Sequence, residues 1–467
     1  MEQTHFDLVI IGGGPAGYGA ALYGASAGLD IAIIERDKVG GTCLHRGCIP
    51  AKELLETAAI VRTVRHAGDF GVMVEPKSLD WNVTMERKQA VVDKLANGVV
   101  GLLKNRKVTI LNGTATLGPG RTVEVVAEDG ERATLTSDAV ILASGSVPRT
   151  IPGFEPGGPV VTSDEFFHID RVPDRAVVIG GGAIGCEFAS TLADLGAEVT
   201  VLEALPKILP GCDEDVTRVV LQAFKKKGID VRTGVAVTGH RPGADGGTTV
   251  TFGDGEELAT DLVVVSVGRS PFTEGLLQDG TAVRTSERGH LVVDELYRTG
   301  EPAVWAIGDV IDTPQLAHVG FAEAICVIKD ILGESPTPVD NSRVPWAIYC
   351  NPEVAFAGLS EQAAKDAGYD VVTSRHRFGG NSRAQILGET DGLVKIIAKK
   401  EADGTAGQVL GVHMVGPWVT EQLSGGYLAV NWEASVDEVA AFIQPHPSLT
   451  ELFGESVLAL TGRSLHG

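Results

Sequence analysis

Short apolar runs, each followed by a glycine cluster, recur along the chain and predict strands that end in tight turns. Residues 6–11 predict a buried strand, which leads into the glycine turn 12–17 and then into a small-residue helix over 18–28. A second apolar run at 31–34 predicts another strand, and this one ends at Glu35. An acidic side chain at that point can accept hydrogen bonds from the hydroxyl pair of a ribose. The pattern therefore predicts a dinucleotide-binding unit.

The same order of elements returns later in the chain. A strand is expected at 176–179, a glycine turn at 180–185, a helix as far as 195, and a strand at 199–202 that leads into Glu203. The glycines expected to shape the two turns are Gly12, Gly14 and Gly17 in the first copy and Gly180, Gly182 and Gly185 in the second. One such pattern alone can be an ordinary turn. Here both copies have a preceding strand, a following helix and an acid at the right distance, which indicates two bound nucleotides.

The rest of the chain fits around these two units. Two runs ending in small residues, 139–145 with Gly145 and 262–268 with Gly268, are expected to be the closing strands of the two nucleotide domains. A further run at 303–309 predicts a strand tipped by Asp309, which is either a strand-end turn or a hydroxyl acceptor for a cofactor. From about residue 344 strands and helices alternate without a nucleotide fingerprint, which predicts a separate C-terminal domain.

Composition narrows the class of protein. A chain of 467 residues with 43% hydrophobic residues, 21% charged residues and 59 glycines is typical of a soluble α/β protein with several domains. No apolar run is long enough to span a membrane, and a strand that begins almost at once leaves no room for a signal peptide, so a cytoplasmic location is expected. The formal charge of −22 argues against nucleic-acid and membrane partners.

Cys43 and Cys48 form the one close pair among six cysteines, and such a pair in a reducing compartment is more often catalytic or metal-binding than structural. On an ideal helix they would be rotated by about 140° from each other, so a bridge requires a distortion, which Gly47 and Pro50 facilitate. A distorted disulfide is reducible, and a helix N-terminus together with the Arg46 charge would lower a thiol pKa. A zinc half-site and a structural disulfide are the alternatives, but no second CxxC or HxxxH cluster accompanies the pair, so no metal is expected.

With two nucleotide units, the segment 40–52 (Gly-Gly-Thr-Cys…Gly-Cys-Ile-Pro-Ala-Lys) and a C-terminal His-Pro segment, the chain resembles the two-cysteine pyridine nucleotide-disulfide oxidoreductases over essentially its whole length. The resemblance implies that the first nucleotide domain holds FAD, that the second binds NAD, and that Asp309 accepts a hydroxyl of the flavin cofactor. It also implies that electrons pass between nicotinamide, flavin and the dithiol. Cys48 would be the charge-transfer thiolate against the flavin, and Cys43 the interchange thiol.

The resemblance also assigns residues outside the dithiol. His446, in the segment 444–451, is implied as the acid/base, with Glu451 as its orienting partner, although an isolated histidine is usually a surface or packing residue. Lys52 and Glu187 match an ion pair beside the flavin, the alternative being ordinary helix-surface charge. The family's active unit is a homodimer in which His446 reaches the dithiol of the partner subunit.

These expectations define a fold class: an α/β protein with two Rossmann-like dinucleotide-binding domains and an α+β C-terminal dimerisation domain. The expected divisions are 1–148 for the first part of the FAD-binding domain, 149–275 for the NAD-binding domain, 276–343 for a central domain completing the FAD site, and 344–467 for the dimerisation domain.

Within the family, the residues favour one substrate. Glu203 favours NAD, because its carboxylate would repel a 2′-phosphate, and 204–210 offers one lysine and no arginine, unlike the NADPH-dependent glutathione and trypanothione reductases. The last cysteine is Cys350, so the C-terminal thiol pair of mercuric reductase and large thioredoxin reductases is missing. The chain is most similar to the dihydrolipoamide dehydrogenases, which implies a lipoyl carrier as partner and possible service in a 2-oxo acid dehydrogenase complex.

One departure keeps alternatives open. His45 and Arg46 stand between the cysteines where dihydrolipoamide dehydrogenases usually carry an Asn followed by a small or apolar residue. A related NAD(P)H-dependent reductase of another small disulfide is therefore one alternative. A protein that acts chiefly as a structural dimer of a multienzyme complex is the other.

Overall fold

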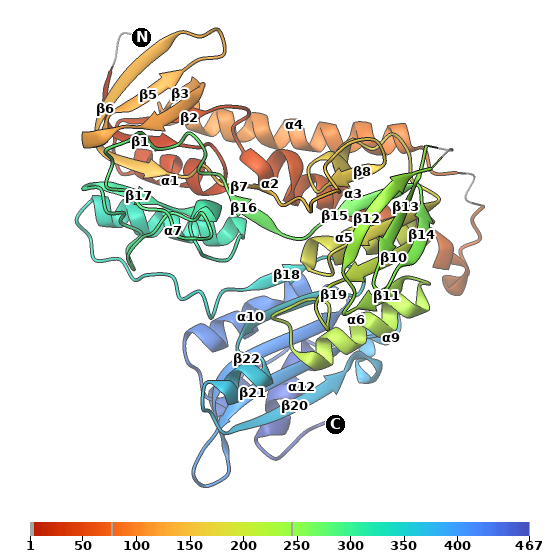
Figure 1. The fold of residues 1–467 in the computed structure, drawn as a ribbon. Helices are drawn as coiled ribbons and strands as arrows, with labels where there is room; N and C mark the ends of the chain where they lie inside the picture. Colours follow the sequence, from red (N-terminus) through yellow and green to blue (C-terminus); the bar gives the residue numbers. More distant parts are fainter. Residues whose placement is uncertain (1–3, 76–77, 244–245, 467) are drawn as a thin grey trace.

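The first nucleotide domain is built on a mixed sheet whose central strands are parallel. The computed structural model describes residues 4–75, 78–243 and 246–466. The strand order is β3-β2-β1-β6-β5-β4, and β17 pairs with β6. The strands are β1 (His5–Ile11), β2 (Ile31–Glu35), β3 (Thr109–Asn112), β4 (Thr114–Leu117), β5 (Val123–Val126), β6 (Arg132–Leu142) and β17 (Val304–Ala306). The apolar run of β1 is buried in a core to which α1 (Pro15–Ser26), α7 (Ala317–Ile331) and the antiparallel strands β4 and β5 contribute side chains (Figure 1).

The helices of this domain are α1, α2 (Gly41–Arg46), α3 (Cys48–His66), α4 (Trp81–Asn105) and α7, with the 3-10 helices η1 (Ala67–Phe70), η2 (Pro119–Arg121) and η4 (Gly308–Val310). In this domain α1 packs against both α7 and α4. The expected helix over 18–28 begins earlier, at Pro15, because proline at the first helical position has a suitable φ and lacks only an N–H that would be unpaired there. The strand expected over 303–309 is shorter, because β17 ends at Ala306 and η4 follows.

The second nucleotide domain repeats the parallel arrangement with the order β11-β10-β9-β15-β8. Its strands are β8 (Val160–Thr162), β9 (Arg175–Ile179), β10 (Glu198–Glu203), β11 (Asp230–Thr233) and β15 (Leu262–Val265), and a small antiparallel sheet contains β12 (Val237–Pro242), β13 (Thr248–Phe252) and β14 (Glu256–Thr260). Its helices are α5 (Ala183–Leu195), α6 (Glu214–Lys226) and the 3-10 helix η3 (Glu165–His168). An antiparallel ribbon of β7 (Ser146–Pro148) and β16 (Arg269–Pro271) connects the two nucleotide domains.

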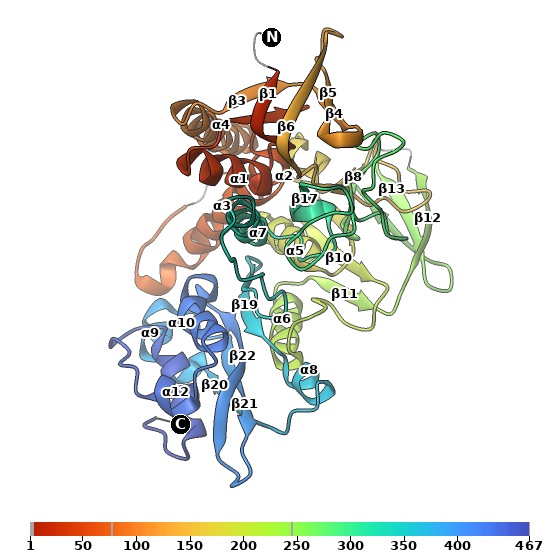
Figure 2. The ribbon, with the colours of Figure 1, turned by 90° about the vertical axis from the view of Figure 1, so that its left-hand side faces the viewer.

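The C-terminal domain contains an antiparallel sheet in the order β18-β19-β22-β21-β20. The strands are β18 (Trp346–Ile348), β19 (Glu353–Gly358), β20 (Val371–Arg377), β21 (Leu393–Lys400) and β22 (Ala406–Gly416). The helices are α8 (Glu361–Asp366), α9 (Ser382–Leu387), α10 (Val419–Asn431), α11 (Val436–Ala440) and α12 (Glu451–Leu460), with the 3-10 helix η5 (Phe378–Gly380). This domain lies below the two nucleotide domains in both ribbon views (Figures 1 and 2).

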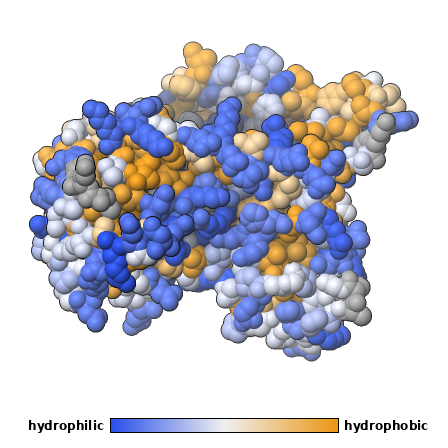
Figure 3. Space-filling view, turned by 90° about the horizontal axis from the view of Figure 1, so that it is seen from above, coloured by the Kyte–Doolittle hydropathy of each residue, from blue (hydrophilic) through white to orange (hydrophobic). Residues whose placement is uncertain are grey.

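The observed architecture confirms the expected fold class. β17 comes from the segment 276–343 and joins the first sheet, as a segment that completes the FAD site should, while the domain boundaries themselves stay a prediction. One hydrophobic core joins the second nucleotide domain, α3 and part of the C-terminal sheet. None of the helices among the described residues combines the length and the apolar character that a membrane span requires. Polar side chains cover much of the face seen in Figure 3, with apolar patches between them.

Candidate active site

The two close cysteines lie on either side of a break between helices. α2 ends at Arg46 and α3 begins at Cys48, while Gly47 between them has φ −147° and ψ −111°. A Cβ on Gly47 would lie 3.0 Å from the Thr42 carbonyl oxygen and 3.3 Å from the Cys43 Cα, so glycine permits a close approach. The expected distortion at Gly47 is confirmed, and it brings the Cys43 and Cys48 side chains into hydrogen-bond contact as free thiols.

The surroundings of the two thiols shift their pKa values in opposite directions. The hydrogen bond from Cys43 lowers the pKa of Cys48, and the Lys52 ammonium one helical turn further along α3 lowers it too, against the effect of burial. The same hydrogen bond, followed by burial, raises the pKa of Cys43. Arg46, expected to be the nearby cation, forms an ion pair with Asp37 instead. The thiolate therefore forms preferentially at Cys48, which is also the first residue of α3 and so lies at a helix N-terminus.

Lys52 and Glu187 form an ion pair between α3 and α5. The Lys52 Nζ lies 3.0 Å from each carboxylate oxygen of Glu187, whose side chain is only 8% exposed. The Tyr349 N–H also donates to Glu187 at 2.9 Å, and the Lys52 ammonium lies 4.7 Å from the centre of the Tyr349 ring. This buried pair excludes the alternative of ordinary helix-surface charge, and it holds a cation beside the Cys48 sulfur.

His446 and Glu451 form a second pair, in the C-terminal domain. The His446 Nδ1 lies 2.7 Å from a carboxylate oxygen of Glu451, and the Ser448 N–H donates to the other oxygen at 2.8 Å. Burial opposes ionisation of Glu451, but these contacts outweigh it and hold the pKa of that carboxyl below its ordinary value. The carboxylate thus fixes the imidazole, whose side chain is 71% exposed. Within one chain α12 lies at the opposite end of the molecule from α2 (Figures 1 and 2).

The acids at the ends of β2 and β10 are held in the same way by the two glycine turns. Glu35 accepts hydrogen bonds from the N–H groups of Gly13 (2.7 Å) and Asp37 (2.9 Å). Glu203 accepts from the N–H groups of Gly181 (2.5 Å) and Leu205 (2.7 Å). Each carboxylate oxygen keeps a lone pair for a ribose hydroxyl.

The glycines of the two turns fall into three kinds. A Cβ on Gly12 would lie 2.1 Å from the Ala143 carbonyl oxygen, and one on Gly180 would lie 2.4 Å from a backbone oxygen. Both have positive φ, 109° and 106°, so only glycine serves there. In contrast, a Cβ on Gly14 or Gly182 would meet no atom within 4 Å. These two residues precede the N-termini of α1 and α5, so the open space fits the pyrophosphate of FAD and of NAD.

The third glycine of each turn lies against the first: a Cβ on Gly17 would lie 1.9 Å from the Gly12 carbonyl oxygen, and one on Gly185 would lie 1.9 Å from the Gly180 carbonyl oxygen. These glycines therefore allow the helix to pack closely on the preceding strand. Gly145 and Gly268, expected at the ends of the closing strands, both have positive φ and flank the ribbon of β7 and β16.

Asp309 lies in η4, beyond the end of β17. Its carboxylate accepts a hydrogen bond from the Ser146 hydroxyl at 2.6 Å, and the Arg269 Nε donates to the same hydroxyl at 2.8 Å. Arg269 is nearly buried and also contacts Thr42, next to Cys43, at 3.4 Å. The sequence interpretation missed Arg269, although a charged residue immediately after the small-residue end of a closing strand was a usable signal.

The described residues hold no group of three or more His, Cys, Asp or Glu side chains that could bind a metal ion. The Cys43 and Cys48 side chains form a hydrogen bond with each other, and the Lys52 charge acts on both. The chemistry of this donor set is therefore that of a redox dithiol with an adjacent cation.

Comparisons with known proteins agree with this geometry. A family model described as pyridine nucleotide-disulphide oxidoreductase matches residues 6–324, and a model of that family's dimerisation domain matches residues 344–457. The dihydrolipoyl dehydrogenase of Bacillus subtilis (strain 168) is 41% identical over 482 residues, covering 99% of this chain and 99% of the relative. That of Haloferax volcanii is 37% identical over 471 residues, covering 99% of this chain and 98% of the relative.

Solved structures show the same overall similarity. The crystal structure of LpdA from Mycobacterium tuberculosis superposes with a TM-score of 0.91 at 26% identity, over 98% of this chain and 100% of that one. A hypochlorous acid-induced flavoprotein disulfide reductase from Escherichia coli, solved as a Cu(II) complex, superposes with a TM-score of 0.88 at 25% identity, over 98% and 100% of the two chains.

Proposed function

The chain belongs to the pyridine nucleotide-disulphide oxidoreductase family, and we propose that within it the protein oxidises dihydrolipoamide to lipoamide with NAD⁺ as the final acceptor. Its cofactors are FAD and NAD. The observation that carries the proposal is the polarised dithiol, in which Cys48 favours the thiolate and Cys43 the thiol. Full-length relatives named dihydrolipoyl dehydrogenase support this choice of substrate.

The chain's own residues supply the thiol chemistry. With Cys43 and Cys48 joined as a disulfide, a substrate thiolate attacks the Cys43 sulfur, the bond between the two cysteines breaks, and Cys48 leaves as a thiolate. The hydrogen bond from Cys43 that forms afterwards and the Lys52 ammonium stabilise that thiolate. The second substrate thiol then attacks the lipoyl sulfur bound to Cys43, which releases oxidised lipoamide and the free Cys43 thiol.

His446 moves the protons in these two steps. It takes a proton from each attacking substrate thiol and returns one to the departing Cys43 sulfur, while Glu451 fixes the imidazole tautomer. Bound FAD supplies a ring that carries the electron pair from the dithiol to the nicotinamide. Glu35 and Gly14 are suited to hold FAD, and Glu203 and Gly182 to hold NAD. Asp309 is proposed as a hydroxyl acceptor for FAD, supported by its position immediately beyond β17.

The active unit proposed is a homodimer built on the matched dimerisation domain. In one chain α12, which begins at Glu451, lies at the opposite end of the molecule from α2, which contains Cys43, so the partner subunit's His446 would complete the site. Phe442 and Ile443, close to His446 in the chain, are 66% and 89% exposed, as residues buried by a partner subunit would be in a single chain. A cytoplasmic location and service in a 2-oxo acid dehydrogenase complex are part of the same proposal.

The residues between the cysteines have partners that keep them away from the sulfurs. The His45 Nε2 lies 2.9 Å from the Val39 carbonyl oxygen, and Arg46 pairs with Asp37. The unusual His45-Arg46 pair therefore does not argue for a different disulfide substrate. Reduction of another small disulfide with NAD(P)H remains the second candidate, favoured by the similarity to a flavoprotein disulfide reductase.

A steady-state assay tests the proposal. The purified protein should be yellow, should turn over dihydrolipoamide far faster than glutathione, and should prefer NAD⁺ to NADP⁺. Cys48→Ser should abolish turnover and retain FAD, with Cys212→Ser, which removes a buried thiol outside the site, as the matched control. A colourless folded protein, or full turnover by Cys48→Ser, would contradict the proposal.

A further inference from the structure

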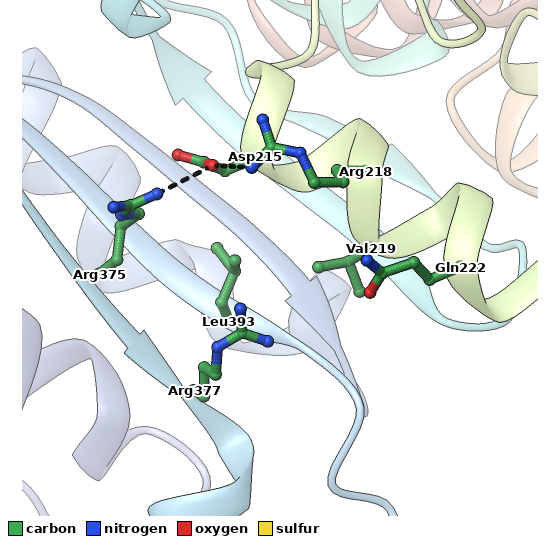
Figure 4. A pocket seen from close by; sticks show the side chains of 7 residues that line it. All are labelled: Asp215, Arg218, Val219, Gln222, Arg375, Arg377 and Leu393. Carbon is green, nitrogen blue, oxygen red and sulfur yellow. Dashed lines mark hydrogen bonds and ion pairs between the residues drawn. The ribbon is translucent and has the colours of Figure 1, made fainter.

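A pocket remote from the dithiol lies between the second nucleotide domain and the C-terminal domain. It encloses about 250 Å³ and is lined by side chains of α6, β20 and β21 (Figure 4). These side chains are Asp215, Arg218, Val219, Gln222, Arg375, Arg377 and Leu393. Neither the proposed redox reaction nor the nucleotide sites use any of them.

Local structure places these side chains on two facing surfaces. The four residues of α6 are spaced at helical intervals, so they share one face of the helix. Arg375 and Arg377 are two apart on β20 and therefore point to the same face of the sheet. Leu393 pairs with Arg377 across β20 and β21 and lies between the two groups in the close-up (Figure 4).

The charges of the pocket leave positive charge in excess. Its lining contains three arginines and one carboxylate, Asp215, and this carboxylate already has ion-pair partners. It contacts Lys395 (2.9 Å), Arg218 (2.9 Å) and Arg375 (3.0 Å). Arg218 also pairs with Glu214 at 3.0 Å, and these two contacts leave it further N–H donors. For Arg377, no side-chain hydrogen bond or ion pair is found with any residue that the structure describes. An exposed guanidinium with five unused donors faces this pocket, on a chain whose net charge is −22.

We propose that this pocket binds a small organic dianion, specifically a short dicarboxylate. Guanidinium groups match carboxylates through paired hydrogen bonds, and here they approach from opposite sides, Arg377 from β20 and Arg218 from α6. The apolar Val219 and Leu393 side chains between them suit a hydrocarbon spacer. A cavity of about 250 Å³ admits a molecule of only a few heavy atoms.

Bound ligand would join the two domains. Because Arg218 comes from the second nucleotide domain and Arg377 from the C-terminal domain, a dicarboxylate held by both spans the junction. It lies beside the Lys395 cluster, which already connects these domains. Binding to the native state alone then stabilises the folded holoenzyme in proportion to ligand concentration.

The test is calorimetric titration of the FAD-loaded protein with succinate, in buffer matched for ionic strength with sodium chloride. Saturable binding is expected, weakened about tenfold or more in Arg377→Ala, because a charged hydrogen-bond partner is lost. Arg132→Ala removes an exposed arginine of β6 outside the pocket and should bind as the wild type does. Both variants should keep full dihydrolipoamide turnover without succinate, which shows that each is folded.

Three results would overturn the inference. The first is the absence of saturable succinate binding to the wild-type protein, and the second is equal binding by the wild type and Arg377→Ala. The third concerns ligand class: inorganic phosphate or the monoanion butyrate binding as tightly as succinate would remove the argument for two carboxylates and a spacer.

Discussion

Replacing Lys395 by methionine should weaken the junction between the second nucleotide domain and the C-terminal domain. The Lys395 ammonium on β21 is only 3% exposed and lies 2.9 Å from Asp213, 2.9 Å from Asp215 and 2.7 Å from Glu361. Asp213 and Asp215 belong to the start of α6, whereas Glu361 begins α8. Methionine keeps much of the volume of lysine but leaves three carboxylates without their shared cation.

The expected loss in the free energy of unfolding depends on which contacts the three carboxylates keep without Lys395. Removing one partner of a buried ion pair typically costs about 3–5 kcal/mol. Asp215 keeps Arg218 and Arg375, and Glu361 keeps Lys365, whereas Asp213 loses its ammonium partner and keeps only backbone N–H donors. The lower end of the range is therefore expected, a loss of about 3 kcal/mol in the free energy of unfolding.

The loss should also depend on pH. Burial raises the pKa values of Asp213 and Asp215, but hydrogen bonds from Lys395 outweigh it and hold both pKa values below their ordinary level. A carboxyl with a depressed folded-state pKa stabilises the protein above its unfolded-state pKa of about 4 and loses that contribution as pH falls through the folded value. The difference between wild type and Lys395→Met should therefore be largest near neutral pH and shrink in acid.

Urea unfolding of the holoenzyme, followed by near-ultraviolet circular dichroism near neutral pH and near pH 4 (about the unfolded-state carboxyl pKa), measures this difference. Lys399→Met is the matched control on the same strand, because Lys399 forms an exposed ion pair with Glu401 and its loss should cost about 0.5 kcal/mol or less. If Lys395→Met were no less stable than Lys399→Met, or if its deficit grew in acid, the reasoning would be refuted.

Three further predictions concern the redox and cofactor sites. His446→Gln should slow dithiol oxidation by about 10²- to 10⁴-fold in stopped-flow assays while NAD affinity stays unchanged; equal losses in both would argue against an acid/base role. Gly14→Ala should fold but bind FAD more weakly, whereas Gly12→Ala should not form the FAD site, because its Cβ would clash with a backbone oxygen at 2.1 Å. Fluorescence titration with FAD measures the affinity of each variant, and equal FAD affinity in Gly14→Ala and Gly12→Ala would contradict the different roles assigned to the two glycines. The reduced protein should carry one thiolate near neutral pH, at Cys48, whose ultraviolet thiolate absorbance is lost as acid protonates it; an unchanged absorbance in Cys48→Ser would reverse the assignment.

The sequence determined those features that depend on residues close together in the chain. Each nucleotide unit places a strand, a glycine turn, a helix and an acid within a short segment, so their local patterns predicted two Rossmann-like domains. The distortion at Gly47 was equally local, because five positions on a helix cannot bring two sulfurs together without a break. The roles of His446 and Glu451 came from resemblance, and their functional assignment stays a prediction.

Only the tertiary structure decided which distant groups meet. Lys52 and Glu187 are 135 positions apart, and their contact depends on how α3 packs on α5. Arg269, Lys395 and the arginine pocket likewise depend on where whole domains are in contact, which no spacing along the chain encodes. Burial also decided that Lys52 rather than Arg46 lies beside Cys48, because an ion pair forms according to which charges packing brings together in a water-poor space.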